Sequence, residues 1–210
     1  ILIDKWIDHV NAIRENGLKA DYNGENIVEK LPIFLPEEIE NYKGNIDLVI
    51  LFTKAMQLDD MLQSIKSILS QETKVLCLLN GLGHEDTIEK YVSRENILLG
   101  NTMWTAGLTG PGQVKIFFFC SVDLQNVHPA GKEATLKVVQ VLKEAGLNPE
   151  YSENVKYSIP IEQIISFLTL STEEFDNICS NEEIKTINNI PKEHFVFAVI
   201  KFFKENNLDR

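Results

Sequence analysis

The chain has 210 residues with 31 acidic and 20 basic side chains, a formal net charge of −11 and 44% hydrophobic residues. This composition is typical of a globular protein and excludes collagen-like, low-complexity and wholly disordered classes. The acidic balance argues against a nucleic-acid partner, whose phosphates would be repelled, and no apolar run approaches the ~20 residues that span a membrane.

The first predicted element is a short strand over residues 1–3 that ends at Asp4. Residues 5–15 carry apolar side chains at helical spacing, and Asn16-Gly17 ends this helix because glycine readily adopts the left-handed conformation there. Asn23-Gly24 then predicts a hairpin between strand-like residues 19–22 and 26–31. A short helix is expected from Pro36, with acidic residues at its positive end.

The middle of the chain alternates strand and helix patterns. Residues 47–52 and 74–79 are apolar runs typical of parallel strands covered on both faces, and each precedes a predicted helix, the first over 56–69. Residues 97–99 and 114–119 predict strands around a Gly110-Pro111-Gly112 turn. A helix over 132–145 follows. This alternation predicts an α/β fold with a parallel sheet.

The last fifty residues differ in character from the rest. Three segments look helical, but no glycine-rich turn or strand alternation separates them: 161–170, 172–179 and 192–206. We therefore expect one domain over residues 1–159 and a short helical tail over 160–210.

Two charged residues follow predicted strands. Ligands in open α/β sheets bind just outside the carboxyl ends of the strands. Lys54 follows the most apolar strand, where its ammonium could meet a phosphate, and Asp4 could accept hydrogen bonds from a ribose. A simpler interpretation stays open for each residue. Asp4 would then cap a helix, and Lys54 would be a solvated lysine at a helix start.

Residues 79–83 repeat this arrangement one strand later. Asn80 offers both a donor and an acceptor, and Gly81 and Gly83 would let the backbone approach a planar ring. A plain strand-to-helix turn explains the same residues. Residues 101–107 are small and polar, and they could form another wall of the same crevice.

Other chemistries find little support. No Gly-x-Ser-x-Gly motif is present, and the histidines lack metal-ligand spacing, so no metal is expected. His9 and His84 stand beside acidic residues and are predicted to lie on the surface. The odd number of cysteines favours a reducing, cytoplasmic location: Cys77, Cys120 and Cys179.

Taken in order, these segments resemble the ketopantoate reductase (2-dehydropantoate 2-reductase) family. No single motif is specific, but their order and spacing are, and the resemblance runs from residue 1 to about residue 159. The matching residues are Ile3-Asp4 with Trp6 and His9, Asn16-Gly17-Leu18, Thr53-Lys54-Ala55-Met56-Gln57, Leu79-Asn80-Gly81-Leu82-Gly83, Thr105-Ala106-Gly107 and Gly110-Pro111-Gly112-Gln113-Val114.

The resemblance implies a Rossmann-like parallel sheet that binds NADP, and reduction of 2-dehydropantoate to pantoate in pantothenate biosynthesis. Lys54 resembles the lysine that contacts the cofactor phosphate, and Asn80 the asparagine beside the nicotinamide and the bound keto acid. Ala106 matches a backbone contact to the cofactor, and Gln57 would line the nicotinamide side. Asp4 keeps NAD open as the alternative cofactor, because a carboxylate there repels a 2′-phosphate. A homodimer is a further expectation.

The chain also departs from the family pattern. The opening strand with its Gly-x-Gly-x-x-Gly loop is missing before Ile1. The family's general-acid lysine belongs just after residues 157–159, where this chain continues Pro160-Ile161-Glu162. Residues 160–210 match no part of the family's C-terminal domain. These departures predict that this chain does not reduce 2-dehydropantoate at a useful rate. The alternative function is therefore an inert fragment, at most a nucleotide-binding or interaction module.

Overall fold

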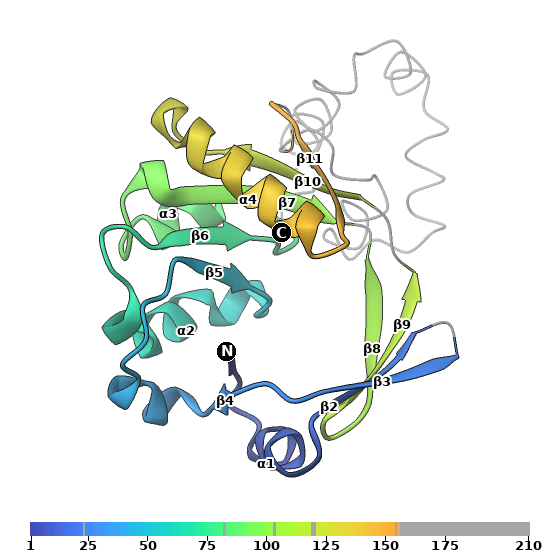
Figure 1. The fold of residues 1–210 in the computed structure, drawn as a ribbon. Helices are drawn as coiled ribbons and strands as arrows, with labels where there is room; N and C mark the ends of the chain where they lie inside the picture. Colours follow the sequence, from blue (N-terminus) through green and yellow to red (C-terminus); the bar gives the residue numbers. More distant parts are fainter. Residues whose placement is uncertain (23, 82, 103, 119–120, 154, 156–210) are drawn as a thin grey trace, which may run out of the picture.

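The computed structural model of this chain describes residues 1–22, 24–81, 83–102, 104–118, 121–153 and 155, which are drawn in colour in Figure 1. The tail predicted over 160–210 and its boundary at residue 159 lie outside these residues. Within them, helices alternate with strands that form sheets of five, four and two strands. The predicted α/β architecture is confirmed.

The five-stranded sheet has the order β11-β10-β7-β6-β5. Its members are β5 (Leu48–Leu51), β6 (Lys74–Cys77), β7 (Ile97–Thr102), β10 (Ser121–Asn126) and β11 (Asn148–Tyr151). Strands β5, β6 and β7 are parallel, and the apolar runs of the sequence supply the first two. Strand β10 pairs antiparallel with β7, so the sheet is mixed rather than wholly parallel.

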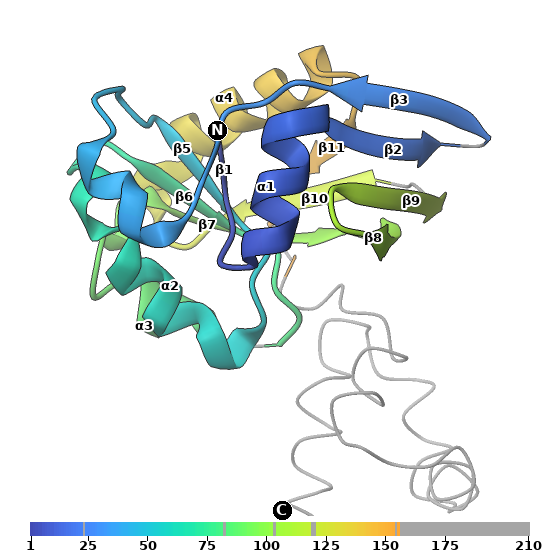
Figure 2. The ribbon, with the colours of Figure 1, turned by 90° about the horizontal axis from the view of Figure 1, so that it is seen from below.

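Helices cover both faces of this sheet. They are α2 (Leu58–Ser64), α3 (His84–Ile88) and α4 (Lys132–Glu144). Successive strand side chains point to opposite faces, so Cys77 packs in one core cluster with Leu62 of α2, and Leu76 in another with Val138 of α4. Figure 2 shows α2 and α3 on one side of the sheet and α4 on the other.

The helix predicted over 56–69 is interrupted. It begins as the 3₁₀ turn Ala55–Gln57, continues as α2, and ends as a second 3₁₀ turn over Lys66–Ile68. The short helix expected at Pro36 is likewise a 3₁₀ helix, Pro36–Asn41. The predicted helical segments therefore exist, but the first is shorter and broken.

The two-stranded sheet joins β1 (Leu2–Ile3) to β4 (Ile33–Phe34) in parallel. Helix α1 (Ile7–Asn16) follows β1, as predicted, and buries Val10 and Ile13 against Ile33. Gly17 then closes the helix at φ 78°. Its backbone lies so near Glu29 that an added Cβ would be 2.9 Å from the Glu29 carbonyl oxygen.

The four-stranded sheet has the order β3-β2-β9-β8. Its members are β2 (Leu18–Tyr22), β3 (Glu25–Glu29), β8 (Thr105–Gly110) and β9 (Gln113–Phe118). The hairpin predicted at Gly24 is confirmed, because Tyr22 pairs with Glu25. Residues 105–107, predicted to follow a strand as a crevice wall, instead begin strand β8. The predicted turn at Gly110-Pro111-Gly112 therefore joins β8 to β9.

Candidate functional site

Three strands end on the same side of the described structure (Figure 2). The last residue of β5, Leu51, pairs with the last residue of β6. Ile3 of β1 packs against the core cluster that contains Leu51, and β1 ends on the same side of the molecule as β5 and β6 (Figure 2). The structure therefore places Asp4, Lys54 and Asn80 after three strands at this edge, where ligands of α/β sheets bind.

The segment after β5 presents exposed apolar side chains next to two polar groups that have no partner among the described residues. Phe52 is 76% exposed and Met56 is 90% exposed. The Thr53 hydroxyl oxygen is buried and has no hydrogen-bond partner within the part of the chain that the structure describes, which is costly unless a ligand supplies one. Lys54 is exposed and, among the residues that the structure describes, has no ion-pair partner. This orphaned hydroxyl and free cation fit an anionic ligand with an apolar ring.

The turn after β6 presents Asn80 and two glycines. Gly81 has φ 115° and Gly83 has φ 82°, values that side-chain-bearing residues rarely adopt. The Asn80 carbonyl oxygen lies 2.9 Å from Nε2 of His84, while the Asn80 side chain is exposed. The backbone is therefore held in place, and the side-chain amide is available to a ligand.

The Asp4 carboxylate uses one oxygen in a local contact, and its other oxygen has no hydrogen-bond partner among the described residues. Its Oδ1 accepts a hydrogen bond from the Trp6 backbone N–H at 2.7 Å, and Trp6 is the N-cap residue of α1. This contact resembles the helix-capping role that the sequence left open. It uses one carboxylate oxygen, so the other can still accept from a ribose hydroxyl.

The last two predicted site residues lie in different places. Gln57 is half-buried in the 3₁₀ turn after Lys54, and its N–H donates to the Lys54 carbonyl oxygen at 2.8 Å. Ala106 is exposed in β8, opposite Ile116 of β9, and so belongs to the four-stranded sheet. The structure therefore groups Gln57 with Lys54, whereas Ala106 stands on a separate sheet.

The expectation that His9 lies on the surface is wrong. His9 is only 9% exposed, and its Nδ1 accepts a hydrogen bond from the Gly112 N–H at 3.0 Å. Its ring also stacks on Trp6, with centroids 5.4 Å apart. His9 shares the buried face of α1 with Val10 and Ile13, and its spacing from these apolar residues is the sequence signal that could have revealed this burial.

Cys77 at the end of β6 is not equipped as a nucleophile. It is a free thiol, 2% exposed. Burial raises the pKa of this thiol to about 11, so the thiolate that reacts is scarce at neutral pH. Its role is packing in the core cluster that contains Leu62.

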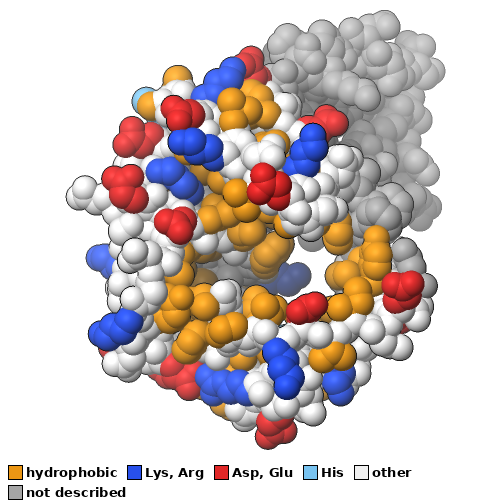
Figure 3. Space-filling model, in the orientation of Figure 1, with side chains coloured by type: hydrophobic (Ala, Val, Ile, Leu, Met, Phe, Trp, Pro, Cys, Tyr) orange, Lys and Arg blue, Asp and Glu red, His pale blue; other side chains and the backbone are white. Residues whose placement is uncertain are grey.

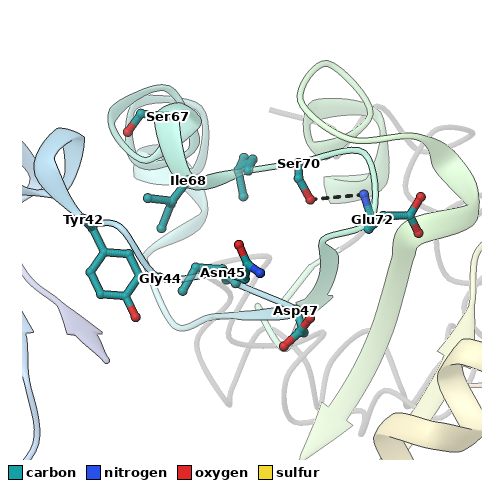
Figure 4. A pocket seen from close by; sticks show the side chains of 10 residues that line it. Tyr42, Gly44, Asn45, Asp47, Ser67, Ile68, Ser70 and Glu72 are labelled. Carbon is teal, nitrogen blue, oxygen red and sulfur yellow. Dashed lines mark hydrogen bonds between the residues drawn. The ribbon is translucent and has the colours of Figure 1, made fainter.

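A separate pocket of about 400 Å³ lies at the opposite, amino-terminal end of β5 and β6. Asp47 and Glu72 line it, and the Glu72 N–H donates to the Ser70 hydroxyl at 3.2 Å (Figure 4). Two carboxylates would repel a phosphate. The edge that carries Lys54 is therefore the better candidate for a dinucleotide.

Figure 3 shows a hollow between the five-stranded and four-stranded sheets, bordered by hydrophobic side chains. An apolar wall of this kind suits the ring systems of a bound small molecule.

No helix in the described residues is long and apolar enough to cross a membrane.

Comparisons with known proteins identify the family of this chain. The family model described as Ketopantoate reductase PanE/ApbA matches residues 1–128. The 2-dehydropantoate 2-reductase of Lactococcus lactis is 58% identical over 158 residues, which are 75% of this chain and 50% of that protein. The enzyme of the same name from Streptococcus pyogenes serotype M3 is 54% identical over 155 residues, 74% of this chain and 49% of that protein. The chain thus spans about half the length of these relatives.

Solved structures agree with this assignment. A structure from Enterococcus faecalis, provisionally named a 2-dehydropantoate 2-reductase, has a TM-score of 0.74 and 43% identity, and covers 98% of this chain and 72% of its own. A D-mandelate dehydrogenase with NADH and anilino(oxo)acetate has a TM-score of 0.70 and 54% identity, and covers 75% of this chain and 50% of its own. The Rossmann-like fold is confirmed, and the chain belongs to the ketopantoate reductase PanE/ApbA family.

Proposed function

We propose that this protein reduces a 2-keto acid with a reduced nicotinamide dinucleotide, and that 2-dehydropantoate is its substrate. The observation that carries the proposal is the pairing of a free cation with an orphaned hydroxyl, Lys54 and Thr53, at the carboxyl end of β5. The relatives described above carry the name of a reductase. They favour an enzyme over the inert fragment, and over the absence of turnover that the departures from the family pattern predict.

Each residue at this edge has a distinct task in the proposal. The Lys54 ammonium binds a cofactor phosphate, because a compact cation suits this group. The Asn80 amide orients the nicotinamide and the keto acid, and Gln57 lines the same side. Ala106 lies on the separate four-stranded sheet rather than at this edge, and in the proposal it contributes a backbone contact to the cofactor. When bound, the cofactor would supply the hydride for the keto carbon, and water would supply the proton that converts the resulting alkoxide to the hydroxyl group. The protein supplies the geometry.

Asp4 favours NADH over NADPH in this proposal. The sequence resemblance implies NADP, but a carboxylate at this strand end accepts from ribose hydroxyls and repels a 2′-phosphate. The free oxygen of Asp4 supports that role, and a D-mandelate dehydrogenase 54% identical to this chain carries NADH. Asp4→Asn should therefore narrow the difference in affinity between NADH and NADPH.

The proposal is tested by following the oxidation of NADH and NADPH with 2-dehydropantoate, and with phenylglyoxylate as a second 2-keto acid. We expect Asn80→Ala to lower kcat/KM, because the amide orients both reactants. The loss of transition-state stabilisation should be about 1–3 kcal/mol. Asn45→Ala, an exposed asparagine in the pocket at the opposite end of the sheet, serves as the control. Absence of turnover with either keto acid and either cofactor would contradict the proposal.

The cytoplasm is the location that we propose, because a buried free thiol such as Cys77 suits a reducing compartment. We also propose a homodimer. Light scattering on the purified protein measures its mass directly, and a monomeric mass would contradict that part of the proposal.

A further inference from the structure

His9 connects two parts of the molecule that are distant in sequence. Its Nδ1 accepts from the N–H of Gly112, which is 103 residues away, at 3.0 Å in a buried position. Gly112 lies in the turn between β8 and β9, whereas His9 lies in the first half of α1. A buried hydrogen bond of this kind ties the tip of the hairpin to the helix.

Gly112 makes further close contacts with β2 and α1. Its carbonyl oxygen accepts from the Lys19 N–H at 2.9 Å. Its φ is 68°, and an added Cβ would lie 3.1 Å from the Ala12 Cβ. The turn therefore rests directly on α1 with no space for a side chain.

His9 is itself fixed by a chain of contacts that begins at Asp4. The Asp4 carboxylate accepts from the Trp6 N–H, and the Trp6 ring stacks on the His9 ring at an interplanar angle of 14°. One end of this chain is thus the acid proposed to bind the ribose. The other end is the hairpin that carries Ala106.

We propose that His9 is a positioning residue, which holds the β8–β9 hairpin, and with it Ala106, at a fixed place relative to Asp4 and helix α1. This inference rests on the proposed function, because it assigns Asp4 and Ala106 to one cofactor site. His9 does not touch the cofactor in this role. It acts through the Gly112 backbone.

Three variants separate this role from general packing. His9→Phe keeps an aromatic ring against Trp6 but removes the acceptor, so the hairpin tip loses its bond. His9→Asn places an amide oxygen near the position of Nδ1 and should restore the bond. His128→Phe is the matched control, because the Nδ1 of His128 also accepts a backbone N–H, that of Ala130, in a turn far from the hairpin.

The experiment titrates NADH against each variant at a temperature at which all are folded, and measures hydrogen exchange of the Gly112 amide. We expect His9→Phe to raise the Kd for NADH by about three- to tenfold and to speed Gly112 exchange. His9→Asn should recover most of both effects, and His128→Phe should change neither.

Two failures can be told apart. If the wild-type protein binds neither NADH nor NADPH, the proposed function fails and the positioning role fails with it. If the wild type binds NADH and His9→Phe binds it equally well, only the positioning role is overturned. That role is also overturned if His9→Phe lowers the melting temperature and changes nothing else.

Discussion

The five-stranded and four-stranded sheets differ in how much of their side-chain surface is buried. The first is covered by helices on both faces and contains side chains with no exposed surface, such as Leu76 and Leu98. In the second, all five residues of β3 are exposed, and Leu108 of β8 is 60% exposed. Hydrophobic burial therefore stabilises one sheet, whereas the other depends more on its strand pairing and on the contacts of its turns.

Core truncation should give the largest effect. Leu76→Ala removes a fully buried side chain from the five-stranded sheet, and we expect a loss of about 2–5 kcal/mol in the free energy of unfolding. Leu108→Ala is the matched change in β8 and should cost under about 1 kcal/mol, because most of that side chain already meets solvent. Urea denaturation measures the free energy of unfolding of both variants. Equal losses would contradict the difference in burial between the two sheets.

The turn of the four-stranded sheet should be the next most sensitive. Gly112→Ala forces a side chain into a positive φ and against Ala12, and should cost about 1–3 kcal/mol. Gly24→Ala has a similar φ of 86° but meets nothing within 4 Å, so its cost should be the backbone strain alone. The difference between the two variants measures the contact of the β8–β9 turn with α1. Identical losses would mean that this contact contributes nothing.

The smallest effect is expected at the ion pair between Arg14 of α1 and Glu38, next to the two-stranded sheet. The hydrogen bond from Arg14 lowers the pKa of the Glu38 carboxyl, and that from the Leu35 N–H adds to it. Because the folded pKa is below the unfolded value of 4.5, the stabilisation is present above pH 4.5 and lost as the pH falls through the folded pKa. Both side chains are partly exposed, so the effect is modest.

Melting temperatures between neutral and acid pH test this pair. Glu38→Gln should lower the melting temperature at neutral pH, and its difference from wild type should vanish in acid. The neighbouring exposed Glu37→Gln is the control. A difference that persists at the lowest pH would contradict the role of the charge.

Elements whose residues show a clear local pattern of apolar spacing or turn residues are predictable from the sequence. The apolar runs of β5 and β6, the helix α4 and the hairpin at Gly24 all agree with the prediction. Strand β8 is not evident from the sequence because Thr105–Gly110 contains two glycines and a single large apolar residue, Leu108, and it becomes a strand through pairing with β9. Strands β10 and β11 are not predicted for a related reason, since their order in the sheet depends on partners distant in sequence.

The candidate site is predictable to a similar degree. Lys54 and Asn80 follow the neighbouring parallel strands β5 and β6, so their place at that end of the sheet follows from strand direction, whereas Asp4 follows β1 of the separate two-stranded sheet. Their binding roles stay predictions. The burial of His9 is not predicted, since its partner Gly112 is 103 residues away. The missing partner of the Thr53 hydroxyl likewise depends on three-dimensional packing, which no local pattern reports.

The central claim is that a reduced nicotinamide dinucleotide binds at the carboxyl ends of β5 and β6, and titration of NADH and NADPH against wild type and Lys54→Ala tests it most directly. Loss of a charge-assisted contact should weaken binding by about 10- to 150-fold. Both cofactors should weaken alike if Lys54 binds the pyrophosphate, and NADPH alone if it binds the 2′-phosphate. Lys66→Ala, an exposed lysine beyond the end of α2, should change neither affinity. Unchanged affinity of Lys54→Ala for both cofactors would contradict the claim.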